Sequence, residues 1–120
     1  MLNIDELNQL LNKIKKEGSL EGIVLAYRDG RLIFENMEDE LDSQKFTSMC
    51  ASVLESASGI GDTIGNRKSR KIIAEIEDTS ILILESSEKT FLSLIIKKES
   101  NFGVILSKLD EITQTIAKIY

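Results

Sequence analysis

The sequence contains no histidine, no proline and no tryptophan, and it has a single cysteine, Cys50. Without histidine the chain lacks the commonest general base and the commonest metal ligand, and one cysteine cannot form an intramolecular disulfide or complete an ordinary zinc site. Carboxylates can catalyse some reactions alone, so these absences disfavour catalysis without excluding it. We therefore expect a protein that is not an enzyme and has no catalytic, cofactor-binding or metal site, in a reducing compartment such as the cytoplasm.

Long apolar runs and an excess of positive charge are also missing. No apolar stretch approaches the roughly 18 residues of a membrane helix, and the opening MLNIDELNQL lacks the apolar core of a secretory signal. The formal net charge of −5 disfavours non-specific binding to nucleic acid or to anionic membranes. The sequence therefore predicts no membrane insertion and no nucleic-acid partner.

What is present is an ordinary globular composition, 42% hydrophobic and 29% charged over 120 residues. This is the length of one domain that can bury a core of its own. No repeat, low-complexity run or linker-like stretch divides the chain. Residues 1–120 are therefore predicted to form a single domain.

Apolar residues at helical spacing predict three helices. The first follows Asn3, a candidate N-cap, and ends at Gly18, which resembles the glycine that often follows a helix. The second runs from about Asp42 to Gly61, and the third follows Asn101 as a further candidate N-cap.

The remaining apolar runs predict five strands. Two of them flank Asp29-Gly30, which is typical of a two-residue hairpin turn. The other three, RKIIAEIED, SILILES and TFLSLIIKK, are joined by pieces too short for crossover helices, so neighbours must run antiparallel. Because several strands are apolar on both faces, both faces of the sheet must be covered. The predicted fold is an α+β, three-layer α/β/α sandwich with the element order α-β-β-α-β-β-β-α.

The stretch SASGIGDTIGNRKSR has the spaced glycines and basic residues of a phosphate cradle. A cradle requires a strand, then glycines, then the N-terminus of a helix, so that backbone N–H groups and the helix dipole converge on the anion. Here Gly59, Gly61 and Gly65 follow a helix and precede a strand. We interpret them as a helix-terminating turn and reject nucleotide binding at this position.

The second helix has an apolar stripe and, opposite to it, a face of small side chains. The stripe comprises Phe46, Met49, Cys50, Val53, Leu54, Ala57 and Ile60. The opposite face comprises Thr47, Ser48, Ala51, Ser52, Ser56, Ser58 and Gly59, with Glu55 almost its only charge. Small side chains let another backbone approach closely, so we interpret this face as a packing surface, with a tolerant solvent-exposed face as the alternative. Packing against a second copy would give an isologous dimer.

A basic cluster of Arg67, Lys68, Arg70 and Lys71 follows the second helix. Basic residues commonly protect an edge strand from unwanted pairing and suit the negative end of a helix dipole. The alternative is contact with an acidic partner surface or with phosphate. We retain Arg67, Lys68 and Arg70 as possible partner contacts.

Taken together, these patterns resemble the roadblock / dynein light chain family over nearly the whole chain. The resemblance lies in the opening helix followed by GIVLAYRDGRLIF, in the small-residue-rich second helix that runs into a glycine turn, and in FLSLIIKKESNFGVILSKLDEI. It implies a profilin-like fold with a five-stranded antiparallel sheet. It also implies dimers in which the third strands pair and the second helices pack side by side. Carried over, the dimer interface comprises Ser48, Ala51, Ser52, Glu55, Lys71, Ile73, Glu75 and Glu77.

The resemblance further implies a homodimeric, non-catalytic regulator or scaffold that binds a Ras-like small GTPase or another NTPase and biases its nucleotide state. If an arginine is supplied in trans, the candidates by type are Arg28, Arg31, Arg67 and Arg70. One alternative is a structural dimerisation adaptor without effect on a GTPase. A second is a small-molecule sensor, for which Tyr27, Cys50 and Ser93 are the main polar candidates. On the dimer hypothesis, Ala51→Arg should give a folded monomer.

Overall fold

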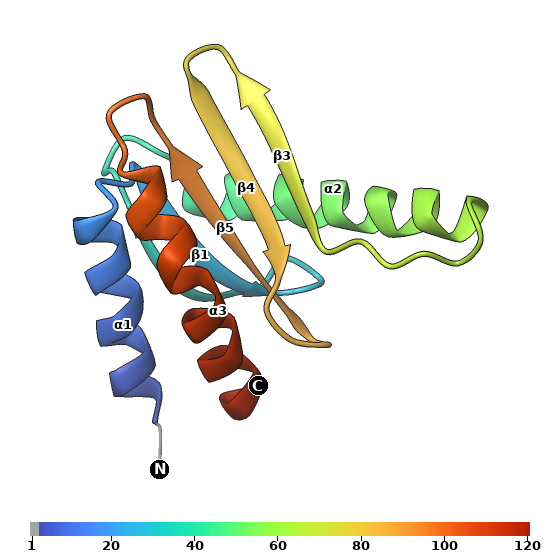
Figure 1. Cartoon of the computed structure of the whole chain (residues 1–120), viewed down its shortest axis with the longest axis horizontal. Helices are drawn as coiled ribbons and strands as arrows, with labels where there is room; N and C mark the ends of the chain where they lie inside the picture. Colours follow the sequence, from blue (N-terminus) through green and yellow to red (C-terminus); the bar gives the residue numbers. More distant parts are fainter. Residues whose placement is uncertain (1–2) are drawn as a thin grey trace.

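The computed structural model describes residues 3–120 and has the predicted order of elements (Figure 1). Residues 1 and 2, which the single-domain prediction includes, lie outside the described residues. The helices are α1 (Ile4–Glu17), α2 (Ser43–Thr63) and α3 (Phe102–Ile119), and the strands are β1 (Gly22–Tyr27), β2 (Leu32–Met37), β3 (Lys71–Ile76), β4 (Thr79–Glu85) and β5 (Thr90–Ile96). Within residues 3–120, none of the helices combines the length and the apolar composition that crossing a bilayer requires.

All five strands join one antiparallel sheet in the order β2-β1-β5-β4-β3. The central strands β1 and β5 are buried along nearly their whole length, whereas β3 is an edge strand with an exposed or half-buried pattern. Helices α1 and α3 lie side by side over one face, and α2 crosses the other (Figure 1). The predicted three-layer sandwich is therefore confirmed.

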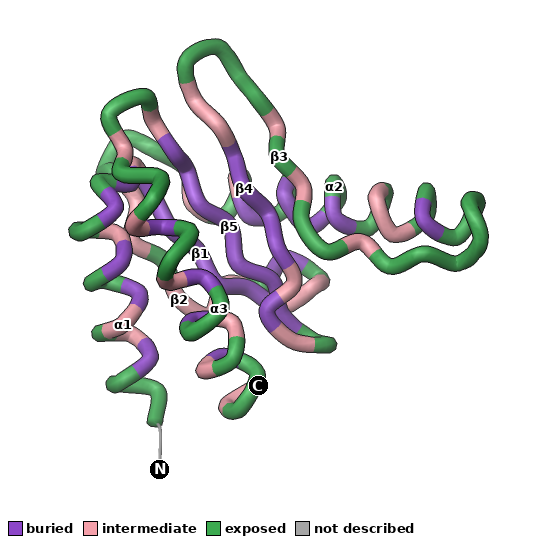
Figure 2. The backbone as a smooth tube through the Cα atoms, viewed as in Figure 1, coloured by how far each residue is buried: buried purple, intermediate pink, exposed green. Residues whose placement is uncertain are grey.

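Two hydrophobic clusters fill the spaces between the layers, and Figure 2 marks along the backbone which residues are buried. The larger cluster joins α1 and α3 to the sheet and contains the fully buried Leu11, Ile105 and Ile112. The smaller cluster lies between α2 and the sheet and contains Leu54 and Phe91. Because successive strand residues point to opposite faces, the sheet supplies side chains to both clusters, as the apolar strands predict.

The caps of α1 confirm its predicted limits and correct the role of Gly18. The Asn3 side chain accepts the backbone N–H of Glu6 at 2.8 Å, as an N-cap does. A glycine that follows a helix often has a left-handed backbone, and the sequence predicted this role for Gly18. In the structure Gly18 has φ −82° and is not left-handed. The left-handed residue is Ser19, with φ 53°. A Cβ at Gly18 would lie 2.7 Å from Cγ1 of Ile105. Glycine is needed there because α3 packs closely against the end of α1.

The turn between β1 and β2 is one residue longer than predicted. The backbone N–H of Tyr27 donates to the carbonyl of Arg31 at 2.9 Å, which closes a loop over residues 28–30. Gly30 has φ 96°, and a bulge interrupts the register after Leu25. A three-residue loop that ends in a left-handed glycine is the next commonest hairpin connection after the two-residue turns.

The second helix begins as predicted and runs two residues beyond its expected end. Asp42 is the N-cap, and its side chain accepts the backbone N–H of Lys45 at 3.0 Å. Gly59 and Gly61 lie inside the helix, and the left-handed residues after it are Gly65, with φ 95°, and Asn66, with φ 56°. The chain then returns along the helix, and the N–H of Arg67 donates to the carbonyl of Gly61 at 2.9 Å. The predicted order of helix, turn and strand is confirmed, but Gly59 and Gly61 belong to the helix, and of the three glycines only Gly65 lies in the predicted turn.

Candidate functional site

The orientation of α2 on the sheet differs from the predicted one. Thr47 and Ala51, expected on the outer face, are buried against the sheet together with Cys50 and Leu54. Thr47 can be buried because its hydroxyl donates to the carbonyl of Ser43 at 2.6 Å. The sequence pattern did not show that Thr47 is buried, because a projection of the helix counts every threonine as polar. A threonine hydroxyl can nevertheless be buried when it donates to a backbone carbonyl of the preceding turn.

Small side chains on α2 do admit another backbone, but it is a backbone of the same chain. A Cβ at Gly30, in the β1–β2 loop, would lie 3.4 Å from the Cα of Ser48 and 3.7 Å from the Cβ of Ala51. The Gln44 amide donates to the Gly30 carbonyl at 3.1 Å and holds the loop against the helix. Ala51 is therefore part of the core of one chain, not of an outer face, which corrects its predicted position.

The exposed flank of α2 is apolar instead. Met49 and Ile60, expected to face the core, are 62% and 63% exposed, and Val53 and the C-cap residue Ile64 are exposed as well. We call these four residues the apolar flank. On the other side of the core-facing residues, Ser52 and Glu55 are exposed. Their assignment to a dimer interface stays a prediction.

The length of α2 explains why part of its apolar stripe remains uncovered. A helix of 21 residues is about 31 Å long, whereas five strands span only about 19 Å between the outer strand axes. In Figure 1 the C-terminal part of α2 extends beyond β3, the edge strand. Sequence reasoning missed this flank because it assumed that the whole apolar stripe faces the sheet. Comparing the two lengths would have found its C-terminal part, Ile60 and Ile64, whereas Met49 and Val53 are exposed because α2 is rotated so that Thr47 and Ala51 face the sheet.

The edge strand β3 completes the surface on this side of the molecule. It bonds only to β4 among the described strands, so one row of its backbone N–H and C=O groups is free. Lys71, Ile73 and Glu75 are exposed on it, and Glu77 follows in the β3–β4 turn with φ 55°. These are the predicted interface residues that the structure brings together at one edge.

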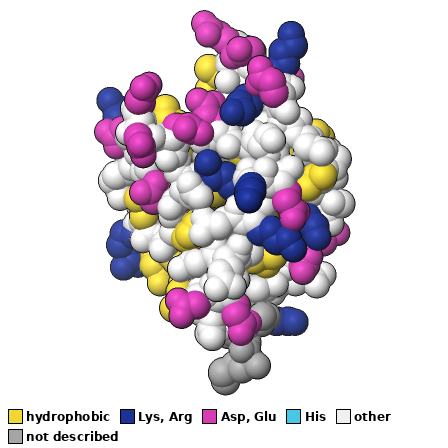
Figure 3. Space-filling model, turned by 90° about the vertical axis from the view of Figure 1, so that its left-hand side faces the viewer, with side chains coloured by type: hydrophobic (Ala, Val, Ile, Leu, Met, Phe, Trp, Pro, Cys, Tyr) yellow, Lys and Arg dark blue, Asp and Glu magenta, His cyan; other side chains and the backbone are white. Residues whose placement is uncertain are grey.

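By contrast, acidic and basic side chains are interspersed on the side where α1 lies, as on a solvated surface (Figure 3).

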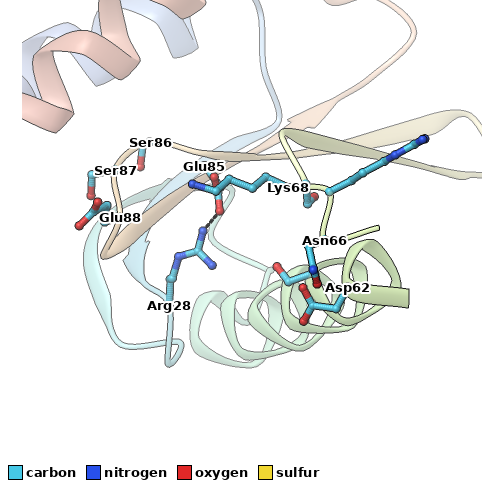
Figure 4. A pocket seen from close by; sticks show the side chains of 11 residues that line it. Arg28, Asp62, Asn66, Lys68, Glu85, Ser86, Ser87 and Glu88 are labelled. Carbon is cyan, nitrogen blue, oxygen red and sulfur yellow. Dashed lines mark ion pairs between the residues drawn. The ribbon is translucent and has the colours of Figure 1, made fainter. Parts of the chain in front are cut away.

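A polar cleft of about 620 Å³ lies beside the C-terminal part of α2 (Figure 4). The segment after the helix and the β4–β5 turn form its walls. Two of the predicted partner contacts, Arg67 and Lys68, line it, and Arg70 does not. Asp62 and Glu88 also line the cleft, so its charge is mixed. Within residues 3–120, no group of three or more histidine, cysteine, aspartate or glutamate side chains is placed to hold a metal ion.

The four candidate arginines differ in their contacts. Arg28 forms an ion pair with Glu85 at the cleft, and its Nε is buried without a hydrogen-bond partner among the described residues. Arg31 pairs with Asp29 at 2.8 Å and stacks 4.6 Å from the Tyr27 ring centre. The Arg31 backbone N–H donates to the Asp29 carboxylate and holds the pKa of that carboxyl below its ordinary value. In the described part of the chain, Arg67 and Arg70 form no ion pair and remain available to a partner.

Several solved structures share this arrangement of layers. The chain aligns with Myxococcus xanthus MglB at a TM-score of 0.87 and 16% identity, covering 98% of this chain and 97% of that one. An MglB in a tetrameric arrangement gives 0.84 and 13%, with 99% and 92% covered. The Roadblock/LC7 domain from Streptomyces avermitilis gives 0.82 and 14%, with 91% and 92% covered. At these identities the similarity shows the fold, which is the roadblock fold that the sequence resemblance predicts.

The family is shown by the sequence itself. A family model described as mitogen-activated protein kinase kinase 1 interacting matches residues 4–120, so the chain belongs to that family. No curated protein matches the chain significantly. Family and fold together confirm the prediction of a roadblock-domain protein.

Proposed function

We propose that this protein is a homodimeric, non-catalytic regulator or scaffold that binds a Ras-like small GTPase or a related NTPase. The observation that carries the proposal is the apolar flank of α2 beside the free edge of β3. A helix flank with large exposed apolar side chains and an unpaired strand edge are both surfaces that a soluble chain normally covers. The resemblance to roadblock proteins implies dimers that regulate GTPases. The roadblock fold of the chain therefore supports the same proposal.

The apolar flank is the part of α2 that we assign to self-association. Met49, Val53, Ile60 and Ile64 recur at spacings of four and seven residues, so they form one continuous strip along the helix. Packing this strip against its copy would remove four large apolar side chains from water. One similar structure is described as an MglB with a tetrameric arrangement, which supports self-association.

The GTPase contact is assigned to the basic residues after α2. Arg67 and Lys68 are exposed, lie at the cleft, and form no ion pair with described residues of their own chain. If the dimer binds one nucleotide state of the GTPase more tightly than the other, it stabilises that state by the difference in binding free energy. An arginine supplied in trans would be Arg67 or Arg70, because Arg28 and Arg31 are engaged within the chain.

Size-exclusion chromatography with light scattering tests the proposal. The protein is measured alone and then with a Ras-like GTPase from the same genome, loaded with GDP or with a GTP analogue. We expect a dimer of about 27 kDa, twice the chain mass of 13.4 kDa, that joins one nucleotide form only. A dimer that ignores the nucleotide would favour the adaptor. A monomer at all concentrations would contradict the proposal.

Two matched pairs of variants locate the surfaces. Ile60→Asp should dissociate the dimer, whereas Ser52→Asp should not, because Ser52 lies outside the apolar flank. The reverse result would support the small-residue face of α2 that the sequence predicted as the dimer interface. Arg67→Glu with Lys68→Glu should weaken GTPase binding. Lys108→Glu with Lys118→Glu on α3 makes the same change in net charge and should not.

The sensor alternative depends on the polar cleft, since a small ligand would need a cavity of that size. A rise in melting temperature with a polar metabolite, lost in Arg28→Ala, would support it. The cytoplasmic location remains a prediction.

A further inference from the structure

We propose that a groove on the face of the sheet opposite α2 docks an amphipathic helix of a partner protein, with basic side chains at the end of that helix that lies beside Glu75. The groove runs over β4, between α3 and the edge strand β3. Because it lies on the other face of the sheet from α2, this proposal goes beyond the proposed function. It requires neither self-association nor GTPase binding.

Helices α1 and α3 cover only part of this face of the sheet. They lie over the part that contains β2, β1 and β5, and no described helix lies in front of β4 and β3 (Figure 1). Neighbouring strand axes are about 4.8 Å apart, so β3 lies about 10 Å from β5. Helices that pack side by side are about 8–10 Å apart. The uncovered part of the sheet therefore has the width of one further helix beside α3.

Apolar side chains form the floor and both walls of the groove. On β3, Ile73 faces Leu82 of β4, and Leu82 belongs to the hydrophobic cluster beneath α1 and α3. Both residues line a hollow of about 250 Å³ together with Ile96 and Phe102. Leu106 follows Phe102 by one helical turn and lies on the same flank of α3. The groove therefore presents an apolar surface that continues from the strand to the helix.

The walls of the groove remain in contact with solvent. Ile73 is 54% exposed, Phe102 43% and Leu106 47%. Helix α1 does not cover them, because it packs against the other flank of α3, where Lys108 and Glu111 line the space between the two helices. Large apolar side chains that adjoin in one exposed patch are typical of an interaction site. An apolar helix stripe is the shape that fits the space beside α3.

The charges around the groove indicate which end of the partner helix is basic. Glu75 lines the hollow at the end where α3 begins. Asp78 and Glu99 lie near this end, and both line a neighbouring hollow with four carboxylates and one lysine. At the other end of β3, Lys71 is exposed instead. Lysine or arginine on the partner would be attracted to the Glu75 end, whereas an anionic lipid surface would be repelled.

The length of β3 determines a suitable probe. Six strand residues span about 20 Å, which corresponds to about 13 residues of α-helix. The probe is a fluorescent peptide of about 14 residues, held helical by a side-chain bridge, with leucines along one face and lysines at one end. One control peptide has the same composition with the leucines spread around the helix. A second has glutamates in place of the lysines. Fluorescence anisotropy measures each dissociation constant.

Paired variants locate the surface that binds the peptide. Phe102→Ser with Leu106→Ser should raise the dissociation constant of the lysine peptide at least about tenfold, because two apolar contacts are lost. Met49→Ser with Val53→Ser removes apolar side chains from the flank of α2 and should change the constant less than about twofold. All four side chains are exposed, so both double variants should keep cooperative thermal unfolding.

Charge reversal tests the polarity of the groove. Glu75→Lys should weaken binding of the lysine peptide and strengthen binding of the glutamate peptide, and both effects should shrink at high salt. Glu111→Lys, on the flank of α3 that faces α1, makes the same change in net charge and should do neither. A Glu75→Lys variant that binds both peptides as the wild type does would contradict the predicted polarity.

Each other occupant of the groove gives a different result. No binding, or equal binding of the peptide with spread leucines, would show that the groove does not dock a helix. If Phe102→Ser with Leu106→Ser instead raises the dimer dissociation constant, a second copy covers the groove. If it instead abolishes cosedimentation with phosphatidylcholine vesicles, lipid covers it; either result would overturn the inference. A wild-type monomer that binds the lysine peptide would support the inference and contradict only the proposed self-association.

Discussion

Helices α1 and α2 are both amphipathic, yet they use their apolar residues differently. In α1, Leu7, Leu11 and Ile14 are almost completely buried between the sheet and α3. In α2, only part of the apolar stripe reaches the sheet, and Met49 and Ile60 remain exposed. The difference shows that the apolar stripe of a helix indicates how much of its surface can be buried. It does not show whether the rest of the same chain buries all of that surface. The surplus on α2 is the basis of the proposed self-association.

Ala51→Arg should have the largest effect, and it tests whether Ala51 belongs to the inner face of α2. The residue is 8% exposed and packs against the sheet and the β1–β2 loop, so an arginine would be overpacked and its charge would be buried without a partner. We expect loss of cooperative thermal unfolding, not the folded monomer predicted from the sequence. Ser52→Arg, at an exposed position of α2 outside the apolar flank, is the control. A folded Ala51→Arg monomer would support the sequence-based position.

Leu11→Ala and Met49→Ala compare the two helices directly. Leu11 is fully buried, so its truncation should lower the free energy of unfolding by about 2–5 kcal/mol at any protein concentration. The effect of Met49→Ala should be smaller and should vary with protein concentration, because it acts on dimerisation. Chemical denaturation at several concentrations separates the two. Equal, concentration-independent losses would mean that Met49 packs within one chain.

Two glycines of α2 allow a sharper comparison within one helix. A Cβ at Gly61 would lie 1.9 Å from the carbonyl oxygen of Arg67, whereas a Cβ at Gly59 meets nothing within 4 Å. Gly61→Ala should therefore destabilise the protein by roughly 1–3 kcal/mol, because the backbone of the returning segment must move. Gly59→Ala should stabilise it by roughly 0.5–1 kcal/mol through helix propensity. Denaturant titrations measure both, and a stabilising Gly61→Ala would contradict the close approach of this segment.

The smallest expected effect concerns pH and the inner face of α2. Burial raises the pKa of the Cys50 thiol above 9.0, and its hydrogen bond with Ser93 acts in the opposite direction. Because the unfolded thiol loses its proton first, this contribution to stability is present below about pH 9 and is lost as the pH rises through the folded pKa. We expect the wild type to lose stability faster than Cys50→Ala above pH 9. Parallel stability–pH curves would contradict it.

Much of the fold was predictable from the sequence, because it depends on local patterns. The predicted helix caps Asn3 and Asn101 each accept a backbone N–H as expected, and the short connections after Glu77 and Ser87 do join antiparallel strands. The rotation of α2 was not predictable, because it depends on which side chains can approach the sheet. The role of Gly18 depended on Ile105, which is distant in sequence.

The candidate site was predictable only in part, for the same reason. The sequence placed Lys71, Ile73 and Glu75 on one strand, but only the strand order makes that strand an edge. Arg67 and Lys68 were recognisable as a basic cluster, whereas their place beside the cleft depends on the returning segment after α2. Nothing in the local pattern separates Arg28 from Arg70; the contact with Glu85 does.

The sequence by itself therefore determined the kinds and order of the elements, the need to cover both faces of the sheet, and the roadblock resemblance. The elements and their order follow from periodicity, caps and turn residues, which act over a few neighbouring positions, whereas the resemblance rests on particular stretches such as GIVLAYRDGRLIF. The tertiary structure alone decided that Ala51 belongs to the core, that the apolar flank of α2 stays exposed, and that β3 keeps a free edge. Those outcomes depend on lengths and contacts between distant segments, such as a helix longer than its sheet is wide.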